Sequence, residues 1–150
     1  MRDLRDFVAE SNLIEGIGLV MQREVEAHET LLALEELTIE HLEIFVAHVQ
    51  PGAKLRRRAG LDVRVGPHVP PPGGPEIEEE LVELLAELHH AMPWENHVAY
   101  ETLHPFTDGN GRSGRAIWAW QMAREGRDPF ALPFLHRVYY DALDHGQRGL

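Results

Sequence analysis

The side chains best suited to chemistry in this sequence lie together in HPFTDGNGRSGR, the segment His104–Arg115. Glycines and an asparagine stand there between two apolar stretches that look helical. Backbone N–H groups at a helix start, together with the helix dipole, attract anions, and glycines let phosphate oxygens come close. Gly109, Asn110 and Gly111 therefore predict an anion-binding helix entrance.

The charged residues of the same segment extend this site. Arg112 and Arg115 are close enough in sequence for their guanidinium groups to bind neighbouring oxygens of a polyphosphate. Asp108 directly precedes the glycines, and one carboxylate acting with phosphate oxygens is a common way to hold Mg²⁺. His104, with an ordinary pKa of about 6.5, can accept a proton from a hydroxyl near neutral pH. This order of groups predicts transfer from the phosphoanhydride of a nucleotide.

Each of these residues has a simpler structural explanation when taken singly. Asp-Gly and Asn-Gly are common turn dipeptides, and arginines near a helix start often stay in solvent. The whole ordered string is much less often structural alone. It fits H-P-F-x-D-G-N-G-R-x-x-R, the signature of the Fic family, at every specified position, so the sequence resembles that family.

The resemblance covers nearly the whole chain. VRVGPHVPPP, residues 63–72, resembles the family's flap hairpin, and RVYYDAL, residues 137–143, its C-terminal helix. A flap of this kind docks the backbone of a target protein as an added strand. The flap residues to which the resemblance gives this role are Val63, Arg64, Val65, His68 and Val69.

The resemblance implies an all-α Fic fold, a helical bundle with one small β-hairpin flap, that transfers AMP from ATP to a hydroxyl side chain of a target protein with Mg²⁺. His104 would be the general base and Asp108 the metal ligand, while a buried Phe106 would anchor the loop. The phosphate-binding residues would be Gly109, Asn110, Gly111 and Arg112 for the α- and β-phosphates, and Arg115 for the γ-phosphate.

Relatives with other activities differ from this sequence at three of these positions. Doc-type kinases have alanine where this chain has Gly109 and lysine where it has Gly111. Phosphocholine-transferring relatives lose the first glycine and the final arginine, here Arg115. The sequence therefore favours nucleotidyl transfer, with a Fic/Doc-type phosphoryl transferase as an alternative.

A second motif near the start of the chain, SNLIEG, resembles the family's autoinhibitory motif S/T-x-x-x-E-G/N and ends at Gly16. Ser11 and Glu15 are i and i+4, so they share one helical face. If that helix packs beside the anion site, the Glu15 carboxylate would pair with Arg115 in the place of the γ-phosphate. ATP would then bind in a pose unsuited to attack.

This motif leaves alternatives open. The partner of Glu15 could lie across a homodimer interface, since relatives with this N-terminal helix are often longer proteins. In some relatives the equivalent carboxylate aligns a water that removes AMP, which would make the chain a deAMPylase. A repressed module that acts through partner binding, as in a toxin–antitoxin pair, is a further alternative, although the intact His104 and Asp108 argue against a loss of chemistry.

Composition agrees with a single domain over residues 1–150. The 14 Lys and Arg against 25 Asp and Glu give a net charge of −11, which argues against nucleic acid or an anionic membrane as partner. The sequence has no cysteine, no secretory signal, and no apolar run of the roughly 18 residues that span a bilayer. We therefore expect a cytoplasmic protein. The basic run KLRRR, residues 54–58, is expected to be a solvated loop.

The elements that must position these motifs are predicted to be helices. Apolar spacing and the placement of glycine and proline indicate them at residues 1–15, 19–36, 38–50, 76–88, 93–103, 115–124 and 133–146. Alternation of apolar and polar residues before Gly66-Pro67 predicts a hairpin over 61–69. A zinc site on His90, His97 and His104 is disfavoured, because Pro93 interrupts their helix.

Overall fold

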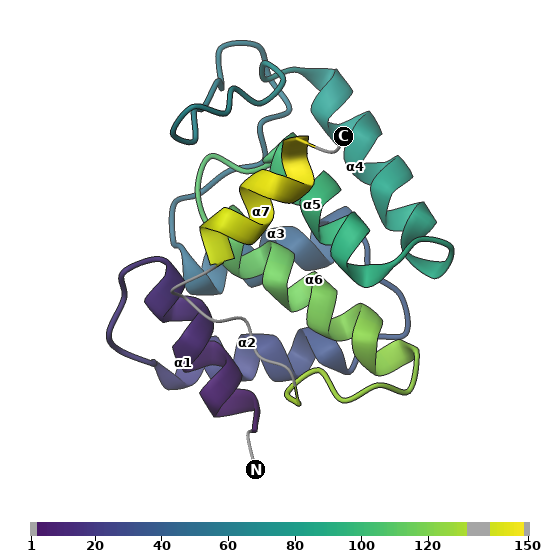
Figure 1. Ribbon diagram of the computed structural model, residues 1–150. Helices are drawn as coiled ribbons and strands as arrows, with labels where there is room; N and C mark the ends of the chain where they lie inside the picture. The colour runs from purple at the N-terminus through teal and green to yellow at the C-terminus, as the bar shows by residue number, and fades with distance from the viewer. Residues whose placement is uncertain (1–2, 132–138, 149–150) are drawn as a thin grey trace.

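The computed structural model describes residues 3–131 and 139–148, and the elements in these ranges are helices (Figure 1). They are α1 (Leu4–Ile14), α2 (Gln22–Leu32), α3 (Ile39–Val49), α4 (Pro75–Ala86), the short 3₁₀ helix η1 (Glu87–His89), α5 (Pro93–Leu103), α6 (Asn110–Arg124) and α7 (Tyr139–Arg148). The predicted all-α architecture is confirmed. None of these helices is both long and apolar enough to cross a membrane.

Helix α6 lies at the centre of the molecule, with α1, α2, α3 and α5 packed against it (Figure 1). Its residues from Asn110 to Met122 are buried, apart from a half-buried Gly111. A helix buried on all sides carries no apolar stripe, so apolar spacing detects it poorly. The start that apolar spacing indicated, at Arg115, is therefore wrong by five positions. The helix begins at Asn110, in agreement with the helix entrance predicted at Gly109, Asn110 and Gly111, and Gly109 in the left-handed region (φ 79°) turns the chain into it.

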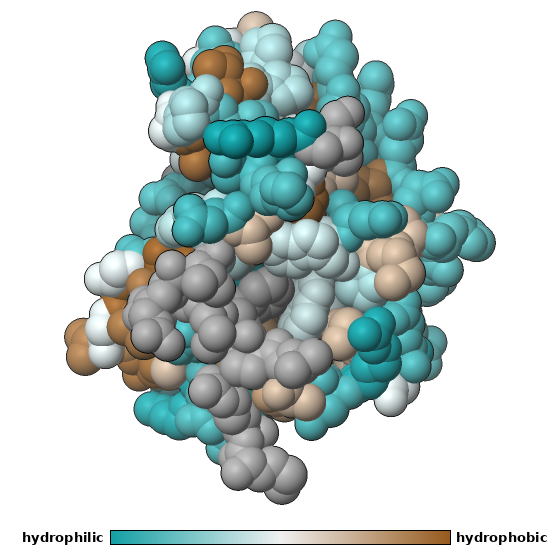
Figure 2. All heavy atoms as spheres, viewed as in Figure 1, coloured by the Kyte–Doolittle hydropathy of each residue, from teal (hydrophilic) through white to brown (hydrophobic). Residues whose placement is uncertain are grey.

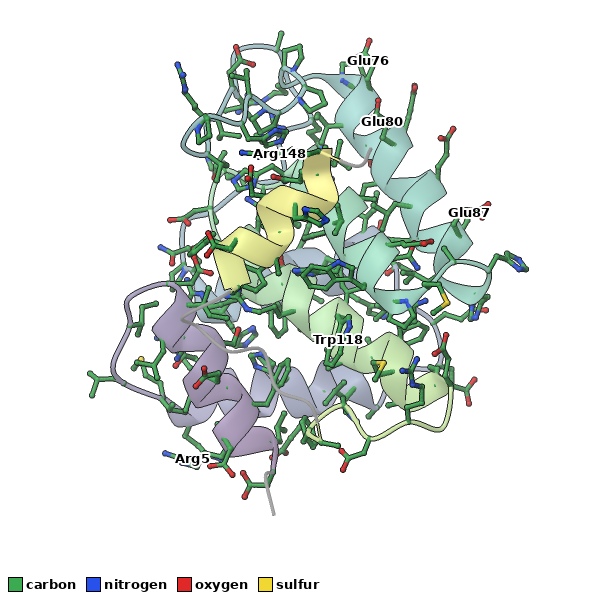
Figure 3. The ribbon with its side chains drawn as sticks, viewed as in Figure 1. Arg5, Glu76, Glu80, Glu87, Trp118 and Arg148 are labelled. Atoms are coloured by element: carbon green, nitrogen blue, oxygen red, sulfur yellow. The ribbon has the colours of Figure 1, made fainter. Side chains whose placement is uncertain are left out.

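Clusters of buried side chains fix the other helices around α6. The largest cluster joins α3, α4, α5 and α6. Phe7 stacks on Trp118 with ring centroids 6.5 Å apart and holds α1 on α6. Figure 3 shows Trp118 inside the molecule, while the acidic side chains labelled on α4 and η1 point outward. Ile14 and Tyr139 belong to a third cluster, which joins the end of α1 to α5 and α7.

Several helix ends differ from the predicted ones. Helix α2 begins at Gln22 rather than at residue 19, because the Glu24 carboxylate accepts the Met21 N–H at 2.8 Å and caps the helix there. It ends at Leu32 rather than at residue 36. Helix α7 continues past Gly146 to Arg148. Its predicted start at Pro133 lies outside the described residues.

The predicted hairpin over 61–69 is not formed as a pair of strands. Val65 and His68 make one isolated antiparallel bridge, with N–H to carbonyl distances of 3.0 and 2.9 Å in the two directions. Pro67 lies inside the turn, and the run of prolines from Pro70 supplies no N–H groups to extend a ladder. The flap is therefore a turn closed by a single bridge.

The face seen in Figure 2 is largely hydrophilic, in keeping with the acidic composition. Apolar side chains gather on it over the connection between α1 and α2 (Figure 2). Leu13, Leu19 and Met21 are the large exposed apolar residues there. This apolar surface directly adjoins the SNLIEG motif.

Candidate active site

His104 ends α5 and opens onto a cleft. It is the helix C-cap in the left-handed conformation (φ 52°), and no other non-glycine residue in the described ranges has a positive φ. Such a conformation costs about 1 kcal/mol or more, so the surrounding structure must hold it. Its N–H donates to the Tyr100 carbonyl at 2.9 Å. The strained residue is thus the one predicted to be the base.

The loop after His104 is shaped by Asn110. The Asn110 side-chain oxygen accepts the Phe106 N–H at 2.8 Å, and its amide nitrogen donates to the Phe106 carbonyl at 2.8 Å. Phe106 is buried in the main core, as predicted. The Asn110 side chain therefore folds the loop, and only its backbone N–H remains for the predicted phosphate contact.

Arg115 extends from the second turn of α6 towards α1. Its Nε donates to the Ser11 hydroxyl at 2.8 Å, and its Nη2 donates to the Ser11 carbonyl at 3.0 Å and to the Glu15 carboxylate at 2.5 Å. The guanidinium also lies over the Tyr139 ring, 4.8 Å from its centroid. The predicted pairing of Glu15 with Arg115 is present within one chain.

The Glu15 carboxylate lies directly against the start of α6. A Cβ built at Gly111 would overlap Glu15 Oε2 and would come within 3.0 Å of Arg115 Nη1. No side chain caps this helix start. The anion that faces the predicted anion site is therefore the protein's own glutamate, and only a glycine at position 111 lets it approach so closely.

Arg112 binds groups of α2 and of the end of α3. Its Nη1 donates to the Val49 carbonyl at 2.7 Å and lies 3.5 Å from the Glu24 carboxylate, while Nη2 donates to Gln50. These partners belong to α2 and to the end of α3. The two arginines thus have different hydrogen-bond partners, while the charge of Glu15 opposes the effect of burial on the pKa of each. That both bind one polyphosphate stays a prediction.

A cleft of about 620 Å³ joins the parts of the site. His104, Glu15 and Gly111 line it, together with the flap turn 65–68 and one face of α7. Figure 3 shows Arg148, another lining residue, at the end of α7 beside the flap segment. The cleft thus lies between the helix entrance and the flap, as a site for two reactants requires.

His104 is held neutral in this setting. Burial, followed by the charges of Arg56 and His68, lowers its pKa to about 4, against the opposing charges of Asp108 and Glu15. At neutral pH the imidazole therefore has a free lone pair and can accept a proton.

Sequence reasoning missed a buried acid beneath the cleft. Glu101 is only 5% exposed, and burial raises its pKa to about 8, with Arg115 lowering it and Glu15 adding to the rise. The His97 Nε2 atom lies 4.0 Å from Glu101 Oε1 and shares a 2.6 Å hydrogen bond with the Tyr139 hydroxyl.

A glycine of α6 makes room for this acid. Glu101 Oε1 would overlap a Cβ built at Gly114. A glycine inside a buried helix was the available sequence signal, because it marks a close approach.

Asp108 is exposed at the mouth of the loop. One carboxylate oxygen accepts the Gly109 N–H at 2.8 Å. Within the described ranges, no group of three or more His, Cys, Asp or Glu side chains could hold a metal ion by itself. A single exposed carboxylate fits Mg²⁺ only if phosphate oxygens and water complete its octahedron.

The flap residues divide into two groups. Val65 and His68 line the cleft, and the His68 imidazole donates from Nε2 to the Thr102 carbonyl of α5 at 2.9 Å. Val63, Arg64 and Val69 are not among the lining residues, and Arg64 donates to the Gly66 carbonyl within the turn at 3.1 Å. The inner side of the flap thus belongs to the cleft.

Helices packed around α6, a strained histidine at the end of α5 and a glycine-rich entrance to α6 together define a Fic-fold domain. A family model described as the Fic/DOC family matches residues 12–122, and the chain belongs to this family.

Curated relatives are similar over most of this chain. The protein adenylyltransferase Fic of Aedes aegypti is 33% identical over 79% of this chain and 25% of its own length. The protein adenylyltransferase Fic of Drosophila persimilis is 32% identical over 95% of this chain and 30% of its own length. That of Culex quinquefasciatus is 34% identical over 79% of this chain and 25% of its own length. The chain therefore spans between a quarter and a third of the length of these relatives.

Proposed function

We propose that this chain is a protein adenylyltransferase domain, which transfers AMP from ATP to a hydroxyl side chain of a target protein. The observation that supports this most is that a neutral imidazole and an uncapped, glycine-containing helix start open onto the same cleft. The hydroxyl oxygen bonds to the α-phosphorus as the bond to the pyrophosphate oxygen breaks. His104 takes the hydroxyl proton.

The phosphate contacts follow from the start of α6. The backbone N–H groups of Asn110 and Gly111 and the helix dipole favour the α- and β-phosphates, and the Gly109 N–H would join them after leaving the Asp108 carboxylate. Arg115 would bind the γ-phosphate, and its buried Nη1, which has no hydrogen-bond partner among the residues that the structure describes, offers a further donor for it. Arg112 would have to leave its contacts with α2 and α3 to reach a phosphate.

Asp108 would hold Mg²⁺ together with the phosphate oxygens. The ion would supply positive charge to the leaving pyrophosphate. This fits the exposure of Asp108, and the carboxylate oxygen bonded to Gly109 leaves the other oxygen of the group for a ligand. The chain's own residues bind and orient the reactants.

The conformation described above would be an inhibited one. The Glu15 carboxylate and a γ-phosphate both need Arg115, so they compete for the same guanidinium. Ser11 and the turn at Gly16, which donates its N–H to the Leu13 carbonyl at 3.0 Å, set the position of Glu15. ATP would be productive only after α1 has released Arg115.

A second candidate activity is removal of AMP from a modified target. The Glu15 side chain is 27% exposed and lines the cleft, and its Oε1 lies 3.4 Å from the Tyr140 hydroxyl. A carboxylate in this position could accept a proton from an attacking water. Glu15 would then be a catalytic base rather than only an inhibitor.

The test uses ATP labelled at the α-phosphate and three forms of the protein: wild type, Glu15→Gly, and Glu15→Gly with His104→Ala. Transfer predicts strong labelling of protein by Glu15→Gly, weak labelling by wild type and none by the double variant. Equal labelling by all three would remove the proposal. Loss of label from a premodified target with wild type, but not with Glu15→Gly, would favour the second activity. No labelling and no removal by any form would favour a partner-binding module.

A further inference from the structure

Arg56 is a fully buried cation in a run of residues that was predicted to be solvated. Its neighbours Arg57 and Arg58 are exposed, and Arg57 pairs with Glu43 and Glu78 on the surface. The guanidinium of Arg56 takes a different kind of partner. Its hydrogen bonds within the described residues all go to backbone carbonyls.

These carbonyls belong to two segments beside the cleft: the end of α5 and the flap segment. Nε donates to the His104 carbonyl at 2.7 Å, and Nη2 to the Leu103 carbonyl at 2.9 Å. Nη1 donates to the Leu61 carbonyl at 3.1 Å and to the Pro71 carbonyl at 2.8 Å. One guanidinium therefore joins both ends of the flap segment to the end of α5.

The backbone of Arg56 adds to the same connection. Its N–H donates to the Pro105 carbonyl at 2.8 Å, and its own carbonyl accepts the Gly74 N–H at 3.0 Å. The side chain and main chain thus bind the catalytic loop on one side and the segment after the flap on the other.

The positive charge of Arg56 is favourable at the C-terminal end of α5. The last carbonyls of α5 have no partners within the helix and carry the negative end of its dipole, so a positive charge there is favourable. Because an unpaired buried charge is costly, the close bonding of four carbonyls is needed to keep it there. Lysine could not replace arginine, since one ammonium cannot spread its donors over two separate segments.

We infer that Arg56 is a positioning residue: it holds His104 in its left-handed conformation and sets the flap at a fixed place relative to the imidazole. This rests on the proposed function, in which a target hydroxyl docked beside the flap must reach His104. The residue does not line the cleft itself, so it acts through the carbonyls that it binds.

Its charge has a second effect on the same histidine. After burial, Arg56 is the largest cause of the lowered pKa of His104, with His68 acting in the same direction and Asp108 and Glu15 in the opposite one. The cation that orients the imidazole thus also favours its neutral form.

The test compares Arg56→Lys and Arg56→Gln with the matched surface variant Arg57→Lys. Amide hydrogen exchange is measured over the whole chain, and the His104 imidazole is titrated by NMR, assigned with His104→Ala. In both Arg56 variants we expect exchange at least about tenfold faster in 61–74 and in 103–107 together, with α1 to α3 unchanged. In Arg56→Gln the pKa of His104 should also rise. Arg57→Lys should resemble wild type.

Other outcomes overturn the inference. These are faster exchange in only one of the two segments, faster exchange throughout the chain, or an unmoved His104 titration in Arg56→Gln. If neither Arg56 variant folds, wild type alone provides the test. The amides of Arg56 and Gly74, which donate to the Pro105 and Arg56 carbonyls, should then exchange with the same opening free energy, and distinct values contradict the coupling. None of these readouts requires AMP transfer, so they remain informative if the proposed function fails.

Calorimetry with Mg-ATP provides a further control. In a Glu15→Gly background, Arg56→Lys should bind Mg-ATP with a Kd within about twofold of that of Glu15→Gly alone.

Discussion

Glu15 and Arg115 are 100 positions apart in the chain, and their side chains meet at 2.5 Å in front of the α6 entrance. Ser11, one helical turn before Glu15, binds the same guanidinium through both its hydroxyl and its carbonyl. One face of α1 therefore supplies three oxygens to one arginine. In the proposed function this set of oxygens takes the place that the end of a triphosphate would occupy.

This geometry predicts that Ser11→Ala releases the inhibition in part. The substitution leaves Arg115 Nε without a partner in a buried place, which weakens the hold of α1 by about 1–3 kcal/mol, while the contacts with Glu15 and the Ser11 carbonyl remain. Labelling from ATP should therefore lie between that of wild type and that of Glu15→Gly. The control is Leu13→Ala, since Leu13 is largely exposed on α1. Labelling equal to wild type would mean that the hydroxyl contributes nothing to the inhibition.

A second prediction concerns the contact between α5 and α6. A Cβ built at Gly114 overlaps the Glu101 carboxylate and comes within 2.9 Å of the Tyr100 ring, both of them buried. We expect Gly114→Ala to lower the free energy of unfolding by about 1–3 kcal/mol, because the fully buried Tyr100 ring cannot move aside and Glu101 would have to shift towards the cleft. Urea unfolding measures this. Gly18→Ala is the control, since nothing lies within 4 Å of a Cβ there. Equal midpoints for the two variants would contradict the tight contact.

The sequence was most informative where the relevant contacts follow from local geometry. The i, i+4 spacing of Ser11 and Glu15 places both on one helical face, and that face does meet Arg115. The burial of Phe106 was likewise correct. The roles assigned to these residues in catalysis and inhibition stay predictions.

The failures concern contacts that depend on packing between distant segments. The hydrogen-bond partners of Arg112 are carbonyl and carboxylate groups on α2 and α3, which a motif does not contain. The burial of Arg56 was not predicted, because its partners are backbone carbonyls, which every residue type has. Glu101 is buried because α5 packs against α6 at Gly114, and this contact between two helices cannot be read from the sequence.

The exposed position of Asp108 leads to a third prediction. Asp108→Ala should abolish Mg²⁺-dependent transfer in a Glu15→Gly background and leave the melting temperature within about 2 °C, because an exposed loop carboxylate with one local hydrogen bond contributes little to stability. Asp108→Asn keeps the shape and should lose transfer as well. A collapsed melting temperature in both variants would instead identify Asp108 as a structural residue.

The last prediction concerns the pH dependence of stability, to which Glu101 and the buried histidines contribute with opposite signs. Burial lowers the pKa of His28 and His104 to about 4 and that of His97 to about 3. The unfolded chain therefore binds more protons than the folded one below about pH 6.5, and stability falls as the pH drops.

Glu101 acts in the other direction. Its pKa is raised to about 8 in the folded protein, so the folded state keeps a proton that the unfolded state releases near its ordinary value of 4.5. Its contribution is complete below pH 4.5 and is lost as the pH rises to about 8, with a slope of at most about 1.4 kcal/mol per pH unit. Between pH 6.5 and 8 the last histidine protons leave the unfolded chain, so the histidines still add some stability while the Glu101 contribution is lost. A variant without the carboxyl is needed to separate the two.

We therefore expect the free energy of unfolding of wild type, relative to that of Glu101→Gln, to fall steadily from pH 6.5 to 8. Glutamine resembles the protonated acid in shape but cannot ionise, and the histidines contribute equally to both proteins. The neighbouring groups Arg115, Glu15 and His97 are the same in wild type and in Glu101→Gln. The comparison therefore isolates the proton on Glu101. Urea unfolding at half-unit steps of pH provides the measurement. Parallel curves for the two proteins across this window would mean that Glu101 is already ionised at pH 6.5, held in that form by Arg115.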